Sequence, residues 1–220
     1  MVNHPAIILW LVNSMMLWSP LGKPRWHESK AEDIDHAKSR YEASAKAAFQ
    51  TVYDPNVKPI FDFPAKNARA ESAILLLWIA NKESNFSEVV QYHTGTWHGF
   101  ADNGNSFCFM QIKLPRYADD KGNIFRKTTR EGYTWEQLIG EDPERCFRAG
   151  YRIVKSSLNS CRHLENFNDR LSQYATGHCE ANNKKSRARL EPAIDWFWSH
   201  LPPVDDAEVM EFIQKNSESI

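Results

Sequence analysis

The feature that most constrains the fold is an uninterrupted apolar run from Ala73 to Ala80, which reads Ala-Ile-Leu-Leu-Leu-Trp-Ile-Ala. A helix that is apolar on every side must be surrounded by other elements, whereas a surface helix keeps a polar face. The stretch from Asn67 to Glu83 therefore predicts a central, buried helix. It is too short to span a membrane, which takes about 20 apolar residues. Because convincing strands are almost absent, we expect an all-α fold.

A single carboxylate, Glu83, follows this run. It comes three and four residues after Ala80 and Ile79, so on a helix it shares a face with buried side chains. Burial there favours the protonated form that a general acid requires. Ser84 and Asn85 are poor helix-interior residues, so the helix should end here with Glu83 facing a cleft. The alternative is a helix-end carboxylate turned to solvent.

A polar, turn-rich segment follows, Asp102-Asn-Gly-Asn-Ser-Phe-Cys-Phe-Met-Gln111-Ile112. The Asp-Asn-Gly sequence favours a tight turn, so we expect a small β-hairpin over residues 102–112 beside the active-site cleft. Asp102 is a candidate second carboxylate. Its alternative role, forming the turn, does not exclude a catalytic one.

Three segments in order resemble the signatures of the lytic transglycosylase (SLT domain) and goose-type lysozyme superfamily. Residues 70–86 contain a Glu-Ser pair at a helix end, residues 102–112 contain Met-Gln-Ile, and residues 171–177 read Leu-Ser-Gln-Tyr-Ala-Thr-Gly. The resemblance covers roughly residues 68 to 195. It implies a lysozyme-like helical domain that cleaves peptidoglycan.

The resemblance also implies a role for each matching residue. Glu83 corresponds to the general acid, and Tyr174 to a tyrosine that hydrogen-bonds near it. Ser84, Met110 and Gln111 correspond to substrate-binding positions, with Gln111 lining the sugar groove. Without the resemblance, the residues alone favour a solvent-facing Gln and a core Tyr. No metal or organic cofactor is implied.

Some positions match one branch of the family, and others depart from the family pattern. Asp102 matches the goose-type aspartate that positions the attacking water, and an inverting hydrolase needs two separated carboxylates. A transglycosylase needs only the Glu, because the substrate's own hydroxyl attacks. Lys113 stands where the goose-type pattern has a further aspartate, so hydrolysis and anhydro-forming cleavage both stay open. Cys108 and Phe109 replace Gly-Leu and make the turn bulkier.

The interval between Glu83 and Gln111 also contains an insert. Its aromatic residues, Tyr92, Trp97 and Phe100, could form a wall on which sugar rings stack. The alternative is a surface loop held down by these aromatics.

The sequence contains four cysteines, an even number that suggests two disulfides in a protein acting on cell wall. Their positions relative to the predicted helices favour Cys108–Cys146 and Cys161–Cys179. One alternative is a metal site that combines the second pair with His163 and His178, but adjacent ligands do not reproduce zinc spacing. Another is free buried thiols in a cytosolic protein.

We divide the chain into an apolar N-terminal segment (1–22), an N-terminal helix and connection (23–66), a lysozyme-like catalytic domain (67–205) and a C-terminal helix and tail (206–220). The first segment resembles the core of a signal peptide but lacks a preceding cation. A membrane-associated or core-packing segment is the alternative, and a spanning helix is the least favoured.

Further helices are predicted from periodicity and end signals. Asp142 and Pro143 are typical of a helix start, and Gly177 is typical of a helix end. The basic run at 184–189 is interpreted as a solvated helix face rather than a contact with anionic wall polymer. The predicted helices span residues 27–53, 142–160, 164–176, 187–200 and 208–215.

These observations favour a peptidoglycan glycosidase acting on the β-1,4 bond between N-acetylmuramic acid and N-acetylglucosamine. The alternative is a catalytically inactive glycan-binding or assembly module that keeps the fold. We expect a periplasmic or extracellular monomer whose partner is the glycan strand. A net charge of -1 gives no general attraction to nucleic acid.

Overall fold

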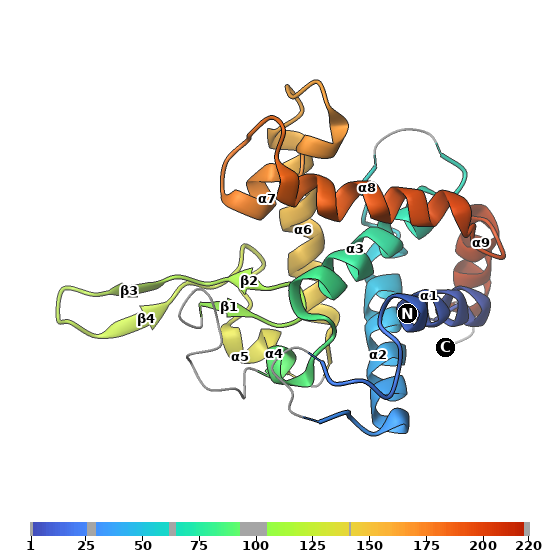
Figure 1. Cartoon of the computed structure of the whole chain (residues 1–220), viewed down its shortest axis with the longest axis horizontal. Helices are drawn as coiled ribbons and strands as arrows, with labels where there is room; N and C mark the ends of the chain where they lie inside the picture. The colour runs from blue at the N-terminus through green and yellow to red at the C-terminus, as the bar shows by residue number, and fades with distance from the viewer. Residues whose placement is uncertain (1, 26–29, 62–64, 93–104, 141, 218–220) are drawn as a thin grey trace.

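The computed structural model describes residues 2–25, 30–61, 65–92, 105–140 and 142–217, and it is mostly helical (Figure 1). Two small antiparallel hairpins accompany the helices. The elements, in chain order, are α1 (Pro5–Trp18), α2 (Ile34–Val52), α3 (Ala68–Ser84), α4 (Glu88–Tyr92), β1 (Ser106–Phe107), β2 (Ile112–Lys113), β3 (Arg116–Ala118), β4 (Ile124–Arg126), α5 (Trp135–Leu138), α6 (Glu144–Ser160), the 3₁₀ helix η2 (Phe167–Asp169), α7 (Ser172–Thr176), α8 (Lys184–Ser199) and α9 (Asp206–Ser217).

Helix α3 is the central helix that the apolar run predicts. It contacts α1, α2, α6, α8 and α9, and Figure 1 shows it crossing the middle of the molecule. Nearly every residue from Ala68 to Ala80 is buried. The helix ends because Asn85 adopts a left-handed conformation with φ of 50°, which asparagine tolerates better than most residues. This ending sets the position of the last turn of α3, which carries Glu83.

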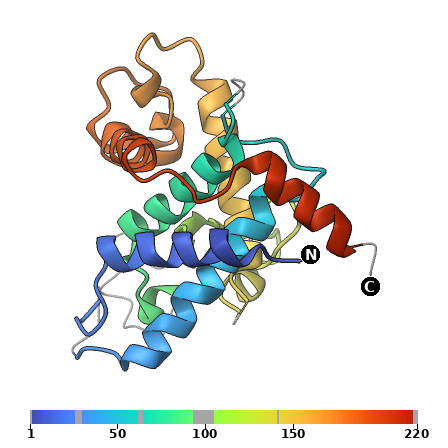
Figure 2. The ribbon, with the colours of Figure 1, turned by 90° about the vertical axis from the view of Figure 1, so that its right-hand side faces the viewer.

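The N-terminal segment forms α1, which packs into the core. Ile7, Leu11 and Met15 lie on one side of it and are completely buried. Figure 2 shows α1 lying alongside α3 and across α2, in agreement with the contacts between these helices. In the structure, the described part of the N-terminal segment therefore packs into the core. None of the helices in the described part of the chain has the length and apolar character that a membrane crossing requires.

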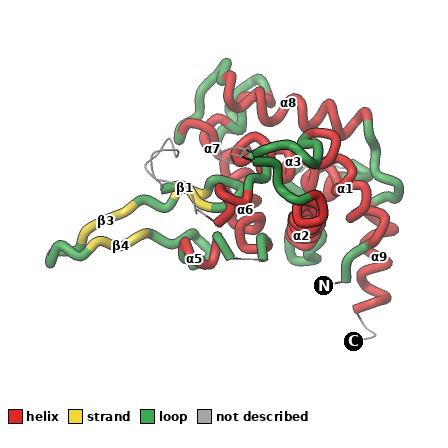
Figure 3. Tube along the Cα trace, turned by 60° about the horizontal axis from the view of Figure 1, so that its bottom comes forward, coloured by secondary structure: helices red, strands yellow, loops and turns green. Residues whose placement is uncertain are grey.

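A small hairpin is present in the second half of the predicted range, with its turn at residues 108–111, whereas the predicted Asp-Asn-Gly turn lies outside the described residues. Strand β1 pairs with β2, with Phe107 opposite Ile112. A second hairpin was not predicted: β3 pairs with β4, with Tyr117 opposite Phe125, and it projects from the helical body (Figures 1 and 3). Its alternating pattern is too short to stand out from a loop, because each strand has only three residues.

The helix predicted over residues 164–176 is wrong as a continuous element. The chain forms η2 and then α7, with Arg170 and Leu171 between them. Asn166 starts η2 by accepting a hydrogen bond from the Asn168 backbone N–H. Gly177 ends α7 with φ of 90°, as expected from a glycine in this position.

The start of α9 is joined to the start of α3 through a buried carboxylate. Asp206 accepts hydrogen bonds from the backbone N–H groups of Arg69 (2.7 Å) and Ala70 (3.2 Å) and from the Tyr53 hydroxyl (2.7 Å). It therefore supplies the α3 N-terminus with the acceptor that Asn67 does not provide. One hydrophobic cluster includes residues from α1, α2, α3, α6, α8 and α9.

Candidate active site

Glu83 lies in the last turn of α3 and faces α8. Its side chain is 17% exposed and pairs with Arg189, which is 16% exposed. The Arg189 Nε donates to Glu83 Oε1 at 2.6 Å, and a second guanidinium nitrogen lies 2.5 Å from the same oxygen. The prediction that Glu83 lies on a partly buried face is confirmed. Glu83 Oε1 is therefore held by the Arg189 guanidinium.

The basic run at the start of α8 is a solvated face only in part: Lys184 and Lys185 are exposed, but Arg187 and Arg189 are half-buried and form ion pairs. Besides Arg189, Arg187 binds Asp169 with its Nε at 2.8 Å. Asp169 is almost fully buried and also accepts from the backbone N–H groups of Asn182 and Asn183. The Arg187 guanidinium, chiefly, lowers the pKa of Asp169. Sequence reasoning missed both ion pairs because their acidic partners lie far away along the chain.

The turn from Cys108 to Gln111 carries the second signature. Cys108 and Gln111 both have left-handed φ angles, 59° and 47°. The departure from glycine at the first position therefore leaves the unusual backbone in place, with Cys108 tied to Cys146. The Gln111 backbone N–H closes the turn on the Cys108 carbonyl at 3.0 Å, and Gln91 Oε1 accepts from the Phe109 N–H at 3.0 Å.

Tyr174 brings the third signature against this turn. Its hydroxyl donates to the Met110 carbonyl at 2.7 Å, and its backbone N–H donates to Ser157 Oγ at 3.0 Å. Burial, chiefly, and the nearby Glu83 carboxylate raise the pKa of Tyr174 well above its ordinary value. Tyr174 therefore keeps its proton and acts as a hydrogen-bond donor.

The structure thus brings Glu83, the Met110 backbone and Tyr174 together, as the family resemblance implied. Gln111 follows at the same turn, where its side-chain amide donates to the Cys108 carbonyl at 3.1 Å. Ser84 is completely buried, and its hydroxyl bonds the Ala80 carbonyl and the Phe86 N–H. The Met110 side chain is completely buried too. These two side chains support the site from behind rather than lining it.

The close packing of Met110 depends on a glycine in α6. A Cβ added to Gly150 would lie 2.6 Å from Met110 Cε and 2.8 Å from Cγ. Real Cβ atoms do not approach other atoms so closely, so Gly150 creates the space that Met110 fills. This contact sets how closely the turn from Cys108 to Gln111 packs against α6.

Asp102, together with Trp97 and Phe100, lies outside the described residues. Its roles as water-positioning carboxylate and turn former, and the sugar-stacking role of the insert, therefore stay as sequence predictions. Tyr92 is described, at the end of α4, and is half-buried. It lines a pocket of about 180 Å³ with His36 and Arg40.

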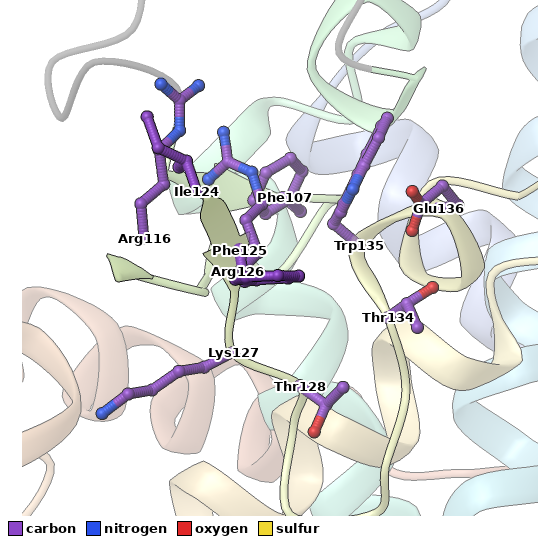
Figure 4. A pocket seen from close by; sticks show the side chains of 10 residues that line it. All are labelled: Phe107, Arg116, Ile124, Phe125, Arg126, Lys127, Thr128, Thr134, Trp135 and Glu136. Atoms are coloured by element: carbon purple, nitrogen blue, oxygen red, sulfur yellow. The ribbon is translucent and has the colours of Figure 1, made fainter. Parts of the chain in front are cut away.

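Two hollows lie near the hairpins. One, of about 280 Å³, has Tyr174 and Lys113 in its lining and lies between β2, α6 and α7. The other, of about 590 Å³, lies at the root of the β3–β4 hairpin (Figure 4). Its lining combines the aromatic rings of Phe107 and Trp135 with the cationic Arg126, which lies over the Phe107 ring at 4.8 Å. Glu83 is not among the residues that line either hollow.

Both predicted disulfides are confirmed: Cys108–Cys146 and Cys161–Cys179. Because the thiols of the second pair are bonded to each other, they do not form the alternative metal site with His163 and His178. The free-thiol alternative is likewise not what the structure contains.

Within the described residues, the one group with metal-ligand types and spacing is Glu32, His36 and Glu88, whose ligand atoms lie within 4.8 Å of one another. Arg40 hydrogen-bonds to both carboxylate oxygens of Glu32. Since these oxygens already bind a guanidinium, an ion-pair cluster accounts for the group without a metal ion.

Comparison of this chain with protein-family models, curated proteins and solved structures finds no match, so the site stands on its own geometry.

Proposed function

We propose that this protein is a peptidoglycan glycosidase that cleaves the β-1,4 bond between N-acetylmuramic acid and N-acetylglucosamine, with Glu83 as the general acid. The observation that supports it best is the contact between Tyr174 and Met110, 2.7 Å from hydroxyl to carbonyl, beside the Glu83 carboxylate. Residues from three separate segments meet at one place, and these are the segments on which the family resemblance rests.

Each residue then has a defined task. Glu83 protonates the leaving glycosidic oxygen, and Tyr174 holds the Met110 turn against the end of α3. Gln111 lies at the backbone turn that borders the bound sugar. A water positioned by Asp102, or the 6-hydroxyl of the muramic acid, then attacks the anomeric carbon. Water yields a reducing end, and the intramolecular hydroxyl yields a 1,6-anhydro end.

For Glu83 to act as the acid, substrate binding has to break its ion pair with Arg189. A general acid must carry its proton and reach the leaving oxygen, whereas Glu83 Oε1 is held by the Arg189 Nε at 2.6 Å. In our proposal the bound sugar excludes water from Glu83 and moves the guanidinium away from it. Glu83 then takes up the proton that it delivers.

The same ion pair favours a second candidate function, a glycan-binding module without activity. A glutamate held permanently by Arg189 would serve the α3–α8 contact and would not transfer protons. Lys113, at the position of a goose-type aspartate, is compatible with either function.

Incubation of the purified protein with cell-wall sacculi, followed by mass analysis of the released fragments, separates these candidates. We expect muropeptides from the wild-type protein, with reducing ends for hydrolysis or anhydro ends for transglycosylation. Glu83→Gln should release none, while Glu165→Gln, an exposed residue, serves as the charge-matched control. A folded wild-type sample that binds sacculi but releases no fragments would support the inactive module instead.

Two disulfides fit an oxidising compartment, where a wall-cleaving enzyme meets its substrate. We propose that the protein acts in the periplasm or outside the cell.

A further inference from the structure

The 280 Å³ hollow that begins at Tyr174 continues into a larger one. A neighbouring hollow of about 780 Å³ shares Arg130, Glu131, Arg152 and Ser156 with it. Together they form one surface, here called the basic groove. It runs from Tyr174 along the outer side of α6 to Lys58, in the connection between α2 and α3.

Positive charge dominates the lining of the basic groove. Glu131 is the single acidic residue in either lining. The cationic residues are Lys58, Lys113, Arg130, Arg148, Arg152 and Lys155. Because the whole chain has a net charge of -1, this is a local concentration of charge and not a general property of the surface.

Internal ion pairs balance only part of this charge. Arg152 pairs with Glu131 at 3.1 Å, and Arg148 pairs with Glu144 and Asp54. Lys58, Lys113 and Arg130 are exposed and form no ion pair with any residue in the described part of the chain. An anionic ligand along the groove would therefore meet cations that no internal carboxylate neutralises.

The shape of the groove fits an extended ligand that also reaches the candidate active site. Its near end contains Tyr174, whose hydroxyl lies 2.7 Å from the Met110 carbonyl and interacts electrostatically with the Glu83 carboxylate. A polymer cleaved at Glu83 would extend past Tyr174 with its side branches over Lys113 and Arg130. Exposed apolar surface at Ile153, which is 38% exposed, lies in the same lining and suits the aliphatic part of such a branch.

We infer that the basic groove binds the carboxylates of the peptide stems carried by the glycan strand. This inference rests on the proposed function, because the stems are the anionic branches of peptidoglycan. The sugar backbone would be held at the Glu83 end, and the free α-carboxylates of a stem would pair with Lys113 and Arg130. The protein would then discriminate peptide-bearing strands from bare ones.

Binding, not turnover, tests this inference. The Glu83→Gln protein, and the wild-type protein on ice as a second sample, are bound to two kinds of immobilised glycan strands: strands that carry their stems, and strands from which an amidase has removed the stems. We expect about tenfold tighter binding to the stem-bearing strands at low salt, and loss of this preference at high salt. Lys113→Glu/Arg130→Glu should lose the preference, while Lys38→Glu/Lys46→Glu on α2, with the same charge change, should keep it.

A further arm identifies the anion. Sacculi treated with hydrofluoric acid lose phosphodiester-linked polymers but keep their stems, and binding should persist. Loss of binding on this treatment would overturn the inference in favour of a phosphate polymer. Equal affinity for stem-bearing and stripped strands, or a preference unaffected by the charge reversal, would also overturn it. Failure of the proposed function would be seen in a different experiment. The wild-type protein would then release no fragments from sacculi, whether or not it binds stem-bearing strands more tightly.

Discussion

Glu83 and Arg189 form an ion pair across 106 positions of the chain, joining the end of α3 to α8 with 2.6 Å between Arg189 Nε and Glu83 Oε1. Both side chains are largely buried. In such surroundings, removing one partner leaves the other charge without compensation, whereas removing both does not.

Arg189→Met should therefore lower the free energy of unfolding by about 2 kcal/mol. Glu83→Gln/Arg189→Met should recover most of that loss, since no unpaired charge remains. Urea unfolding of the single and double variants measures the coupling between the two residues. The control is Arg162→Met, which removes an exposed cation. Additive losses in the double variant would show that the pair contributes nothing to stability.

Gly150→Ala should lower stability by about 1–3 kcal/mol, because its Cβ would overlap Met110. The displaced turn should also weaken the Tyr174–Met110 hydrogen bond and reduce any glycosidase activity by more than stability alone predicts. Chemical denaturation with and without Met110→Ala tests the contact, because the two losses should be less than additive. Asn159→Ala, at an exposed position of the same helix, should leave stability within about 0.5 kcal/mol of the wild type.

Glu71 makes stability depend on pH. It is 2% exposed, and its Oε2 has no hydrogen-bond partner in the described part of the chain. Burial, chiefly, and the neighbouring Asp206 raise the pKa of Glu71 from 4.5 to about 7. Between these values the folded protein binds the proton more strongly than the unfolded chain does, so stability falls as pH rises through this window.

Glu71→Gln should remove this dependence and stabilise the protein at pH 8 by about 1–3 kcal/mol, with little effect at pH 4. Thermal unfolding from pH 4 to pH 8 measures it, and Glu165→Gln is the exposed control. A wild-type stability that rises steadily over this range, unchanged by the substitution, would contradict the assignment.

The two disulfides should contribute unequally. Their cysteines are separated by 38 and 18 positions, so the loop-closure model gives the Cys108–Cys146 bond about 0.7 kcal/mol more than Cys161–Cys179. Replacing each pair with alanines should cost about 4 and about 3 kcal/mol. Denaturant unfolding of both double variants checks the order, and the wild type in reducing agent should lose both contributions.

The sequence alone determined the features that depend on neighbouring residues. The run from Ala73 to Ala80 predicted a buried central helix, and α3 is that helix. Glycine is favoured just after the last turn of a helix because it adopts a left-handed conformation without strain, so the helix end at Gly177 was predicted correctly. The disulfide pairing followed from which predicted elements lie next to each other. Other candidate site residues, such as Gln111, could be named from their motifs but not given contacts.

Only the tertiary structure decided which charges meet. No periodicity links Glu83 to Arg189, because an ion pair between α3 and α8 depends on how the two helices pack. The same applies to Gly150, whose missing side chain matters only because Met110 lies against it. Local propensities act over a few residues and can be read along the chain, whereas a partly buried ion pair or a packing contact exists only after distant segments have been brought together.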